Sequence, residues 1–185
     1  MNNLKELTKE QHKSAERSEF VKVLISGNIN PELYATYLWN QYVKYKELEN
    51  LADRYVLLTD LQGIRRTKKI YSDFLELWNK PGVPVTFPST IDYISHIRTI
   101  SNKQNLLAHI YVHHMGDMSG GQIISKRVPG GCKMYHFTRN IDDLKNALRN
   151  KLTDELAEEA IISFKFAIKL FDDLMTADIA PYKIY

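Results

Sequence analysis

Cysteine is almost missing from this chain of 185 residues, which contains Cys132 and no other. One thiol cannot form an internal disulfide, and no second cysteine is present to complete a CxxC metal or redox motif. We therefore predict a protein of a reducing, cytoplasmic compartment. Cys132 ends a Pro-Gly-Gly-Cys turn, which favours a free thiol at the surface or in a loop.

Long apolar runs and a strong net charge are lacking as well. No stretch approaches the roughly 20 apolar residues that a membrane-spanning helix needs, and residues 1–5 do not resemble a secretion signal. The net charge of +3 is too small to indicate a nucleic-acid-binding protein. We expect a soluble protein with no membrane or nucleic-acid partner, in which basic groups such as Arg65-Arg66 and Lys68-Lys69 could dock an acidic protein.

Alternation of apolar and polar residues, the pattern of a β-strand, is nearly absent, whereas helical periodicity runs through most of the chain. We predict an all-α fold of about seven helices in a single domain over residues 1–185. Helix boundaries follow from Asn, Ser and Thr caps and from Pro and Gly breakers. The predicted helices span residues 2 or 3 to 17, 30–55, 61–78, 89–100, 102–128, 141–151 and 153–177, with Ser89 and Thr153 as caps and a loop over 132–139.

The stretch "YVHHMGDMSGGQ", residues 111–122, places three glycines inside a predicted helix. Each glycine costs roughly 1 kcal/mol relative to alanine in a helix interior, so a specific use of the bare backbone is expected. The helical face that begins with Leu106 and Ile110 continues through His113 to Gly116 and Gly120, so it starts apolar and then loses its side chains. Either a broad planar ligand lies against this backbone, with Asp117 beside it, or another helix packs closely there.

The first predicted helix carries a histidine at the boundary between an apolar face and a charged face. Leu4, Leu7, Gln11 and Ala15 share one face, and Lys5, Lys9, His12 and Glu16 form a stripe beside it. An imidazole at this boundary could bind a metal centre in a flat ligand, with Glu16 accepting its other N–H and the lysines pairing with peripheral carboxylates. The alternative is a hydrogen-bonded boundary histidine beside a solvated cationic face.

Together, the two segments resemble heme oxygenases. "LKELTKEQHKSAERSEF" is similar to the proximal helix of that family, and "YVHHMGDMSGGQ" is similar to its distal-helix signature, with matching order and spacing. The distal motif is specific, and the proximal motif becomes specific in combination with it. The resemblance implies an all-helical, single-domain fold that holds heme between a proximal helix and a kinked distal helix.

The resemblance also implies roles for individual residues. His12 would be the axial ligand of the heme iron, with Glu16 beside it, while Gly116 and Gly120 would lie against the distal face and Asp117 would hold an ordered water. The other matching positions contact the propionates (Lys5, Lys9, Lys145 and Arg149), line the pocket (Tyr111 and Phe164) or belong to the distal network (Tyr42, Tyr93 and His113). By contrast, Tyr34, Tyr37, Tyr45 and Tyr55 are interpreted as core or boundary residues.

Two positions depart from the family pattern. The family commonly has Arg-Tyr where this chain has His113-His114, so the hydrogen-bond network around Asp117 must be arranged differently. Ala167 stands where some relatives have an asparagine of that network. His113 lies one turn from Asp117, which leaves open that it coordinates iron from the distal side.

The chemistry implied by the resemblance is cleavage of heme b, which is both cofactor and substrate, to biliverdin, carbon monoxide and ferrous iron with O2. We expect the α isomer, an external electron donor such as an acidic ferredoxin, a downstream bilin reductase as a possible partner, and a monomer. The first alternative is a heme carrier without catalysis. A thiamin-degrading hydrolase would need a pocket nucleophile, and a di-iron oxidase would need Glu-x-x-His pairs, which this sequence lacks.

Overall fold

A computed structural model describes residues 3–176, and this part of the chain is helical and contains no strand. The all-α prediction is confirmed. The main helices are α1 (Leu4–Leu7), α2 (Lys9–Glu16), α3 (Glu19–Ile25), α4 (Pro31–Arg54), α5 (Thr67–Leu77), α6 (Pro88–Thr99), α7 (Leu106–Ile110), α8 (Gly116–Met118), α9 (Gly121–Ile124), α10 (Ile141–Arg149) and α11 (Ala157–Thr176). Short turns η1 (Lys103–Asn105), η2 (Tyr111–Met115), η3 (Lys133–Tyr135) and η4 (Asp154–Leu156) connect them.

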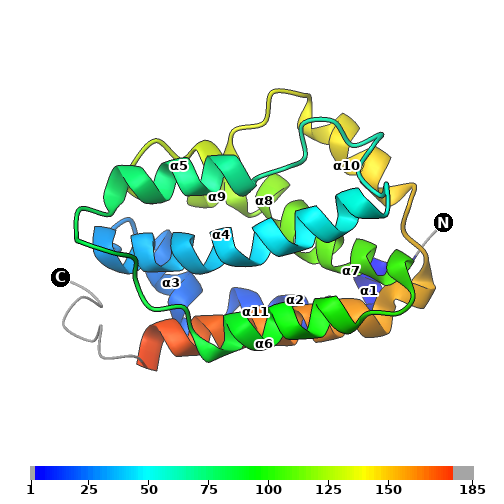
Figure 1. The fold of residues 1–185 in the computed structure, drawn as a ribbon, viewed down its shortest axis with the longest axis horizontal. Coiled ribbons are helices and arrows are strands. Elements are labelled where there is room, and N and C mark those ends of the chain that lie inside the picture. Colours follow the sequence, from blue (N-terminus) through cyan, green and yellow to red (C-terminus); the bar gives the residue numbers. More distant parts are fainter. Residues whose placement is uncertain (1–2, 177–185) are drawn as a thin grey trace.

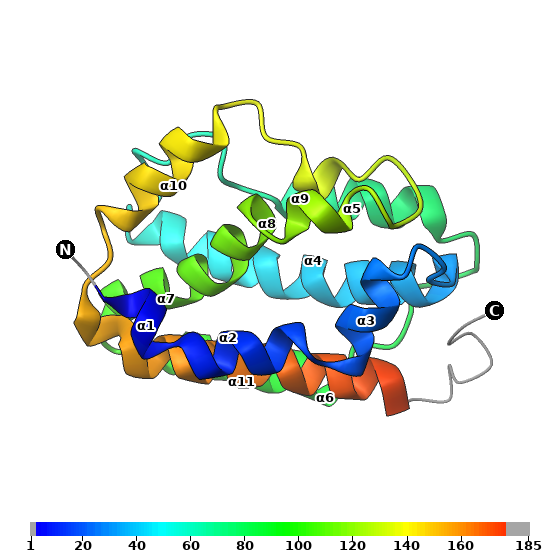
Figure 2. The same ribbon diagram turned by 180° about the vertical axis from the view of Figure 1, so that it is seen from behind.

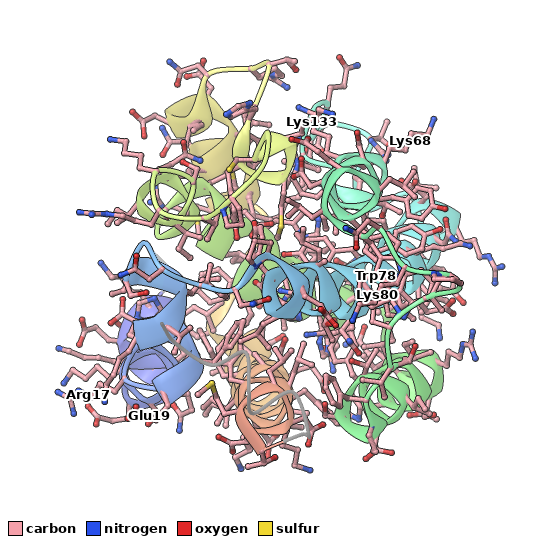
Figure 3. All side chains as sticks on the ribbon, turned by 90° about the vertical axis from the view of Figure 1, so that its left-hand side faces the viewer. Arg17, Glu19, Lys68, Trp78, Lys80 and Lys133 are labelled. Carbon is pink, nitrogen blue, oxygen red and sulfur yellow. The ribbon has the colours of Figure 1, made fainter. Side chains whose placement is uncertain are left out.

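Helix α4 runs through the middle of the molecule and packs against α5, α6 and α7 (Figure 1). Helix α11 lies below it and packs against α2, α3, α6 and α7. Seen along the bundle, α4 is surrounded by the other helices, and side chains fill the spaces between them (Figure 3). Residues of α4 belong to both core clusters, so this helix can supply buried groups to the site described below.

The start of α4 is formed as predicted. Asn30 Oδ1 accepts hydrogen bonds from the backbone N–H groups of Glu32 and Leu33 at 2.8 and 3.3 Å. Pro31 occupies the first turn, where its missing N–H group has no helical partner to lose. The helix ends at Arg54, one residue before the predicted end.

The N-terminal region differs from the single predicted helix. The chain bends at Thr8, whose hydroxyl donates to the carbonyl of Leu4 at 2.9 Å, and this bend separates α1 from α2. Helix α3 was not predicted; Ser18 caps it, and it buries Phe20 among other apolar residues. Leu7, expected on the apolar face, is 45% exposed.

Three other boundaries also needed correction. Helix α5 begins at Thr67 instead of residue 61, because Gly63 has a φ of +87° and the guanidinium of Arg66 binds the carbonyl of Ile64 in the preceding turn. Helix α6 begins at Pro88, and Ser89 is buried inside it instead of acting as the cap. After Thr153 comes the turn η4, which precedes α11, and the predicted helix end at residue 177 lies outside the described residues.

The single cysteine lies in the loop before η3. Cys132 is a free thiol in a loop, as predicted; it is buried, and its Sγ lies 3.4 Å from the carbonyl oxygen of Gly130. Its backbone is left-handed, with a φ of +52°.

Within residues 3–176, no helix is both long enough and apolar enough to span a membrane.

Candidate functional site

The glycine-containing segment is a broken helix, not the continuous helix predicted over residues 102–128. It begins after Asn102, whose side chain accepts from the backbone of Gln104, and runs through α7 into the wider helical turn η2 and then α8. Ser119, with φ −116° and ψ −91°, leaves helical geometry and separates α8 from α9. A wide turn inside a helix is frequent at functional sites, and the predicted kink is present.

The glycines of this segment have different surroundings. A Cβ atom built on Gly116 would meet nothing within 4 Å, and one on Gly120 would meet only the carbonyl oxygen of Gly116, at 3.9 Å. In contrast, a Cβ atom on Gly121 would lie 2.5 Å from the ring of Tyr135. Gly116 and Gly120 thus form a bare, exposed surface, whereas Gly121 permits close packing against Tyr135. A planar ligand on that surface stays a prediction.

Asp117 lies next to this bare surface and is buried. Its Oδ2 accepts a hydrogen bond of 2.8 Å from the hydroxyl of Tyr45 on α4. Burial raises the pKa of Asp117 to about 8, although the Tyr45 hydroxyl and the positive charges of Arg66 and Lys44 act in the opposite direction. The structure thus provides a carboxyl group whose protonation can change near neutral pH.

Tyr45, and not Tyr42, is the tyrosine of α4 that reaches Asp117. Tyr42 lies in an aromatic cluster, with its ring centroid 4.6 Å from that of Tyr71 and 5.6 Å from that of Trp39. Positions three apart in a helix are only about 60° apart around its axis, so packing and not helical spacing separates the two tyrosines. Tyr45 is buried in the core, as predicted, and its hydroxyl is the polar tip that binds Asp117. The place of Tyr42 in the distal network stays a prediction.

The two histidines that depart from the family pattern do not contact Asp117. His114 Nε2 lies 2.9 Å from Oε1 of Glu49, and both side chains are buried. The ring of His113 packs edge-on against Tyr93, with centroids 5.4 Å apart, and lies 5.6 Å from the ring of Tyr45. Burial, together with the charge of Lys44, lowers the pKa of His113 well below its usual value, so this imidazole is neutral.

Several polar atoms around this region have no protein partner. Within the described residues, Nε2 of His113 and the hydroxyl of Tyr93 are buried without a hydrogen bond. Buried polar groups usually find a protein or water partner, so these orphan atoms fit a pocket that holds ordered water. Tyr93 is thus placed in the predicted distal region beside His113.

On α2, the side chain of His12 is 56% exposed. Its Nδ1 lies 3.6 Å from Oε2 of Glu16, one turn later, and its ring meets the buried ring of Phe164 edge-on at 5.9 Å. Helix α2 packs along α11, which carries Phe164, and Figure 2 shows α2 on the same side of the molecule as α8 and α9. Helix α2, with exposed His12, and helices α8 and α9 therefore lie on the same side of the molecule.

The predicted propionate contacts come from α1, α2 and α10. Lys5 is exposed, and Lys9 Nζ forms an ion pair of 3.1 Å with Glu6. Lys145 is half-buried, whereas Arg149 is exposed and donates to Oδ1 of Asn146 at 3.0 Å. Figure 2 places α1 and α10 at the same end of the molecule, which is compatible with cations on two sides of one ligand.

Two further predicted positions lie in the core elements around this region. Tyr111 is half-buried and packs against the larger core cluster, at the start of η2. Ala167 is half-buried on α11 and offers no polar side chain. The asparagine that some relatives have there would supply an amide group, so this part of the network cannot be the same in this chain.

Lys44 is a second residue that the sequence analysis missed. Its side chain is only 2% exposed, and its Nζ lies 4.8 Å from the centre of the Tyr93 ring. Burial lowers the pKa of Lys44 to about 7, although the charge of Asp117 acts in the opposite direction. The helical spacing of Gln41, Lys44, Tyr45 and Leu48, all buried, was the available signal, because it places a lysine on the core face of α4.

The chain thus offers an exposed imidazole with a carboxylate behind it, a bare backbone surface and a buried carboxyl group, which together fit a planar ligand with a metal centre such as heme. The family model described as heme oxygenase matches residues 1–173. The heme oxygenase of Porphyra purpurea is 30% identical, over 94% of this chain and 85% of that protein.

Solved structures show the same fold. Heme oxygenase-1 from the cyanobacterium Synechocystis, in complex with heme, aligns with a TM-score of 0.85 and 22% identity, over 96% of this chain and 92% of that chain. Heme oxygenase from Leptospira interrogans aligns with a TM-score of 0.78 and 27% identity, over 92% and 97%. With the site geometry and the family match in agreement, this chain belongs to the heme oxygenase family.

Proposed function

We propose that this chain is an active heme oxygenase that opens heme to biliverdin, carbon monoxide and ferrous iron. When bound, heme supplies the iron at which O2 is activated. The observation that carries the proposal is that α2 lies on the same side of the molecule as α8 and α9 (Figure 2). Helix α2 carries exposed His12, and the distal segment offers the bare surface at Gly116 and Gly120 with the buried carboxyl group of Asp117. A heme carrier would need His12 but would have no use for a buried acid beside bare backbone.

His12 is proposed to hold the heme iron through Nε2. Its Nδ1 lies on the side of Glu16, which favours the tautomer with the proton on Nδ1 and leaves Nε2 as the ligand atom. The edge of Phe164 limits rotation of the imidazole. A neutral imidazole donates less electron density to iron than a thiolate does, which disfavours O–O cleavage. This choice of ligand suits oxygenation of the porphyrin ring.

Asp117 is proposed to act through ordered water and not by direct contact with the substrate. The hydrogen bond from Tyr45 fixes the orientation of its carboxyl group. Because burial raises the pKa of Asp117 to about 8, the group can hold or release a proton near neutral pH. The missing side chains at Gly116 and Gly120 let the backbone lie close to a planar ligand, and the buried orphan atoms of His113 and Tyr93 could bind the same waters.

The cations around the site are proposed to fix the rotation of the heme. Lys5 and Lys9 on one side and Lys145 and Arg149 on the other would pair with the two propionates. A fixed rotation determines which bridging carbon meets the activated oxygen, and we propose cleavage at the α position.

The electron donor is proposed to be an acidic protein of the ferredoxin type. The chain carries a net charge of +3, and Figure 3 shows Lys68 pointing outward from the molecule. Complementary charge would steer an acidic donor toward such a surface. A bilin reductase that removes the product, a monomeric state and a cytoplasmic location belong to the same proposal.

The experiment that tests the role of His12 compares wild type, His12→Ala and His136→Ala. The His136 side chain is exposed, and the hydrogen bonds of this residue use its backbone, so this variant is a matched control. We expect wild type and His136→Ala to form the same ferric heme spectrum and the same bilin product. His12→Ala should lose the histidine-ligated spectrum and turnover together. An unchanged spectrum in His12→Ala would show that the ligand assignment is wrong.

A further inference from the structure

Two histidines and a glutamate from three helices meet at the end of α6. His96 lies in the last turn of α6, His109 lies in α7, and Glu159 lies in the first turn of α11. Helix α11 packs against both α6 and α7, and Figure 1 shows α6 running along α11. The packing of three helices, and not a local sequence motif, therefore brings these side chains together.

Both imidazoles direct the same nitrogen to one carboxylate oxygen. Nε2 of His96 lies 2.5 Å from Oε1 of Glu159, and Nε2 of His109 lies 2.9 Å from the same atom. One possible ligand atom from each of the three residues lies within 4.8 Å of the other two, and no other group of three His, Cys, Asp or Glu side chains in the described part of the chain is this close. Two imidazole nitrogens and one carboxylate oxygen are a common ligand set of zinc and non-heme iron sites.

The ligand groups are held in the protonation states that bind metals. Burial lowers the pKa of His109 below its usual value, so this imidazole is neutral at neutral pH. Hydrogen bonds from His109 and His96 lower the pKa of Glu159, so its carboxylate is ionised. Lys44, a buried cation that acts on His109, has its own pKa lowered to about 7 by burial, so it carries only part of its charge at neutral pH. Metal ions bind neutral imidazole and ionised carboxylate.

The cluster is reached from solvent on the His96 side. The side chains of His96 and Glu159 are 28% and 13% exposed, whereas that of His109 is fully buried and packs edge-on against Tyr93. A tetrahedral Zn2+ site places its ligand atoms about 3.3 Å apart. Shifts of at most about 1.5 Å in the present separations would reach that spacing, and a glutamate side chain can move this far by rotation about its single bonds.

We propose that His96, His109 and Glu159 bind one divalent transition-metal ion of the Zn2+ type, with water completing its coordination. The ion joins α6, α7 and α11, and because the unfolded chain does not assemble this site, binding stabilises the folded protein. None of the three side chains belongs to the proposed heme site, so the inference does not rest on the proposed function. The alternative is a metal-free cluster in which both imidazoles donate Nε2–H to Glu159.

The first test titrates the full-length, heme-free and metal-free protein with Co2+, followed by visible absorption, and with Zn2+, followed by calorimetry. Wild type should bind one equivalent of each ion. His96→Gln and Glu159→Gln should each weaken binding by more than about tenfold, because each removes a ligand. His136→Ala is the control for an exposed histidine, and His12→Ala tests whether the ions bind at the proposed heme ligand. Both of these variants should bind like wild type.

Thermal unfolding provides the second measurement. With free Zn2+ about 100-fold above the dissociation constant, the midpoint of wild type should rise by about 5–10 °C, and that of His96→Gln should change little. His96 is partly exposed, so His96→Gln should fold, and circular dichroism checks this. The proposal is overturned if wild type shows no saturable binding, if His96→Gln and Glu159→Gln keep wild-type affinity, or if His12→Ala abolishes binding.

Discussion

The hydroxyl of Tyr45 donates a hydrogen bond of 2.8 Å to Oδ2 of Asp117, and this contact joins the central helix α4 to the bare glycine segment. The two residues are far apart in sequence, and both are buried. The contact fixes the orientation of the carboxyl group that follows Gly116 in the sequence. It also makes the geometry of the distal segment depend on α4.

Replacement of Tyr45 by Phe tests this contact. The variant removes the donor and leaves the carboxyl group of Asp117 without its partner, so we expect the free energy of unfolding to fall by about 1–3 kcal/mol. The pKa of Asp117 should rise further, because the Tyr45 hydroxyl stabilises the ionised form. Heme turnover at neutral pH should fall about tenfold, by analogy with the loss of a positioned catalytic hydrogen bond.

Tyr42→Phe is the matched control for this variant. Tyr42 packs against Tyr71 and Trp39, and a phenylalanine keeps those ring contacts. We expect turnover and stability close to wild type. A larger loss of turnover in Tyr42→Phe than in Tyr45→Phe would reverse our assignment of the two tyrosines.

Alanine substitutions at the glycines of the distal segment distinguish a glycine needed for ligand contact from a glycine needed for packing. Gly116→Ala meets no neighbouring atom and should keep or slightly increase stability, by up to about 1 kcal/mol, since alanine favours the helix. Because the new methyl group would stand on the surface proposed for heme, binding and turnover should weaken. Chemical unfolding and heme titration measure the two effects separately.

Gly121→Ala should show the opposite pattern. Its Cβ atom would lie 2.5 Å from the Tyr135 ring, so the variant should lose about 1–3 kcal/mol of stability through overpacking. Where it remains folded, heme affinity should fall less than in Gly116→Ala. Equal losses of heme affinity in both variants would argue against a ligand surface confined to Gly116 and Gly120.

Stability of the heme-free protein should depend on the protonation of Asp117. Its folded pKa of about 8 lies above the unfolded value of about 3.8, so its contribution is fully present below about pH 4 and is lost as the pH rises towards 8. The slope is at most about 1.4 kcal/mol per pH unit for this group. Urea unfolding at about pH 5 and about pH 7.5 measures it, and Asp117→Asn should remove this part of the decline.

Lys44 contributes to the same profile with the opposite sign. Its folded pKa of about 7 lies below its unfolded value of 10.5, so stability should increase as the pH rises from 7 towards 10.5. In Lys44→Met this increase should disappear. A wild-type profile that is unchanged by both Asp117→Asn and Lys44→Met would contradict the burial of these two groups.

Electron transfer from an acidic protein donor should depend on salt. Attraction between opposite surface charges is screened over about 8 Å at physiological ionic strength, so turnover with ferredoxin should slow as salt is added. Turnover with a small chemical reductant provides the control and should change little. Equal salt dependence with both donors would argue against charge-directed docking.

Local sequence signals predicted the parts of the fold that local chemistry determines. Asn30-Pro31 marked the start of α4, and helical periodicity identified the all-α class. The bend at Thr8 and the late start of α5 depended on contacts that a periodicity pattern does not contain, such as the guanidinium of Arg66 binding carbonyl groups far along the chain. Tertiary contacts override local preference at such points.

In the site, too, local sequence signals predicted some features, and tertiary packing determined the others. The bare surface at Gly116 and Gly120 and the contact between His12 and Glu16 followed from helical spacing. Helical spacing did not identify the hydrogen-bond partner of Asp117. Tyr42 and Tyr45 lie on the same helix and both could donate to a carboxylate, and only packing decides which of them faces α8. Lys44 was missed because lysine is usually exposed, and its burial depends on the surrounding helices.

The most direct test of the central claim is aerobic incubation of the purified wild-type protein with one equivalent of heme and an electron donor. We expect the Soret band of the bound heme to disappear while biliverdin, carbon monoxide and ferrous iron form in equal amounts, with the α isomer as the bilin. A Soret band that persists through the incubation, with no bilin and no carbon monoxide, would contradict the account and indicate a heme carrier instead.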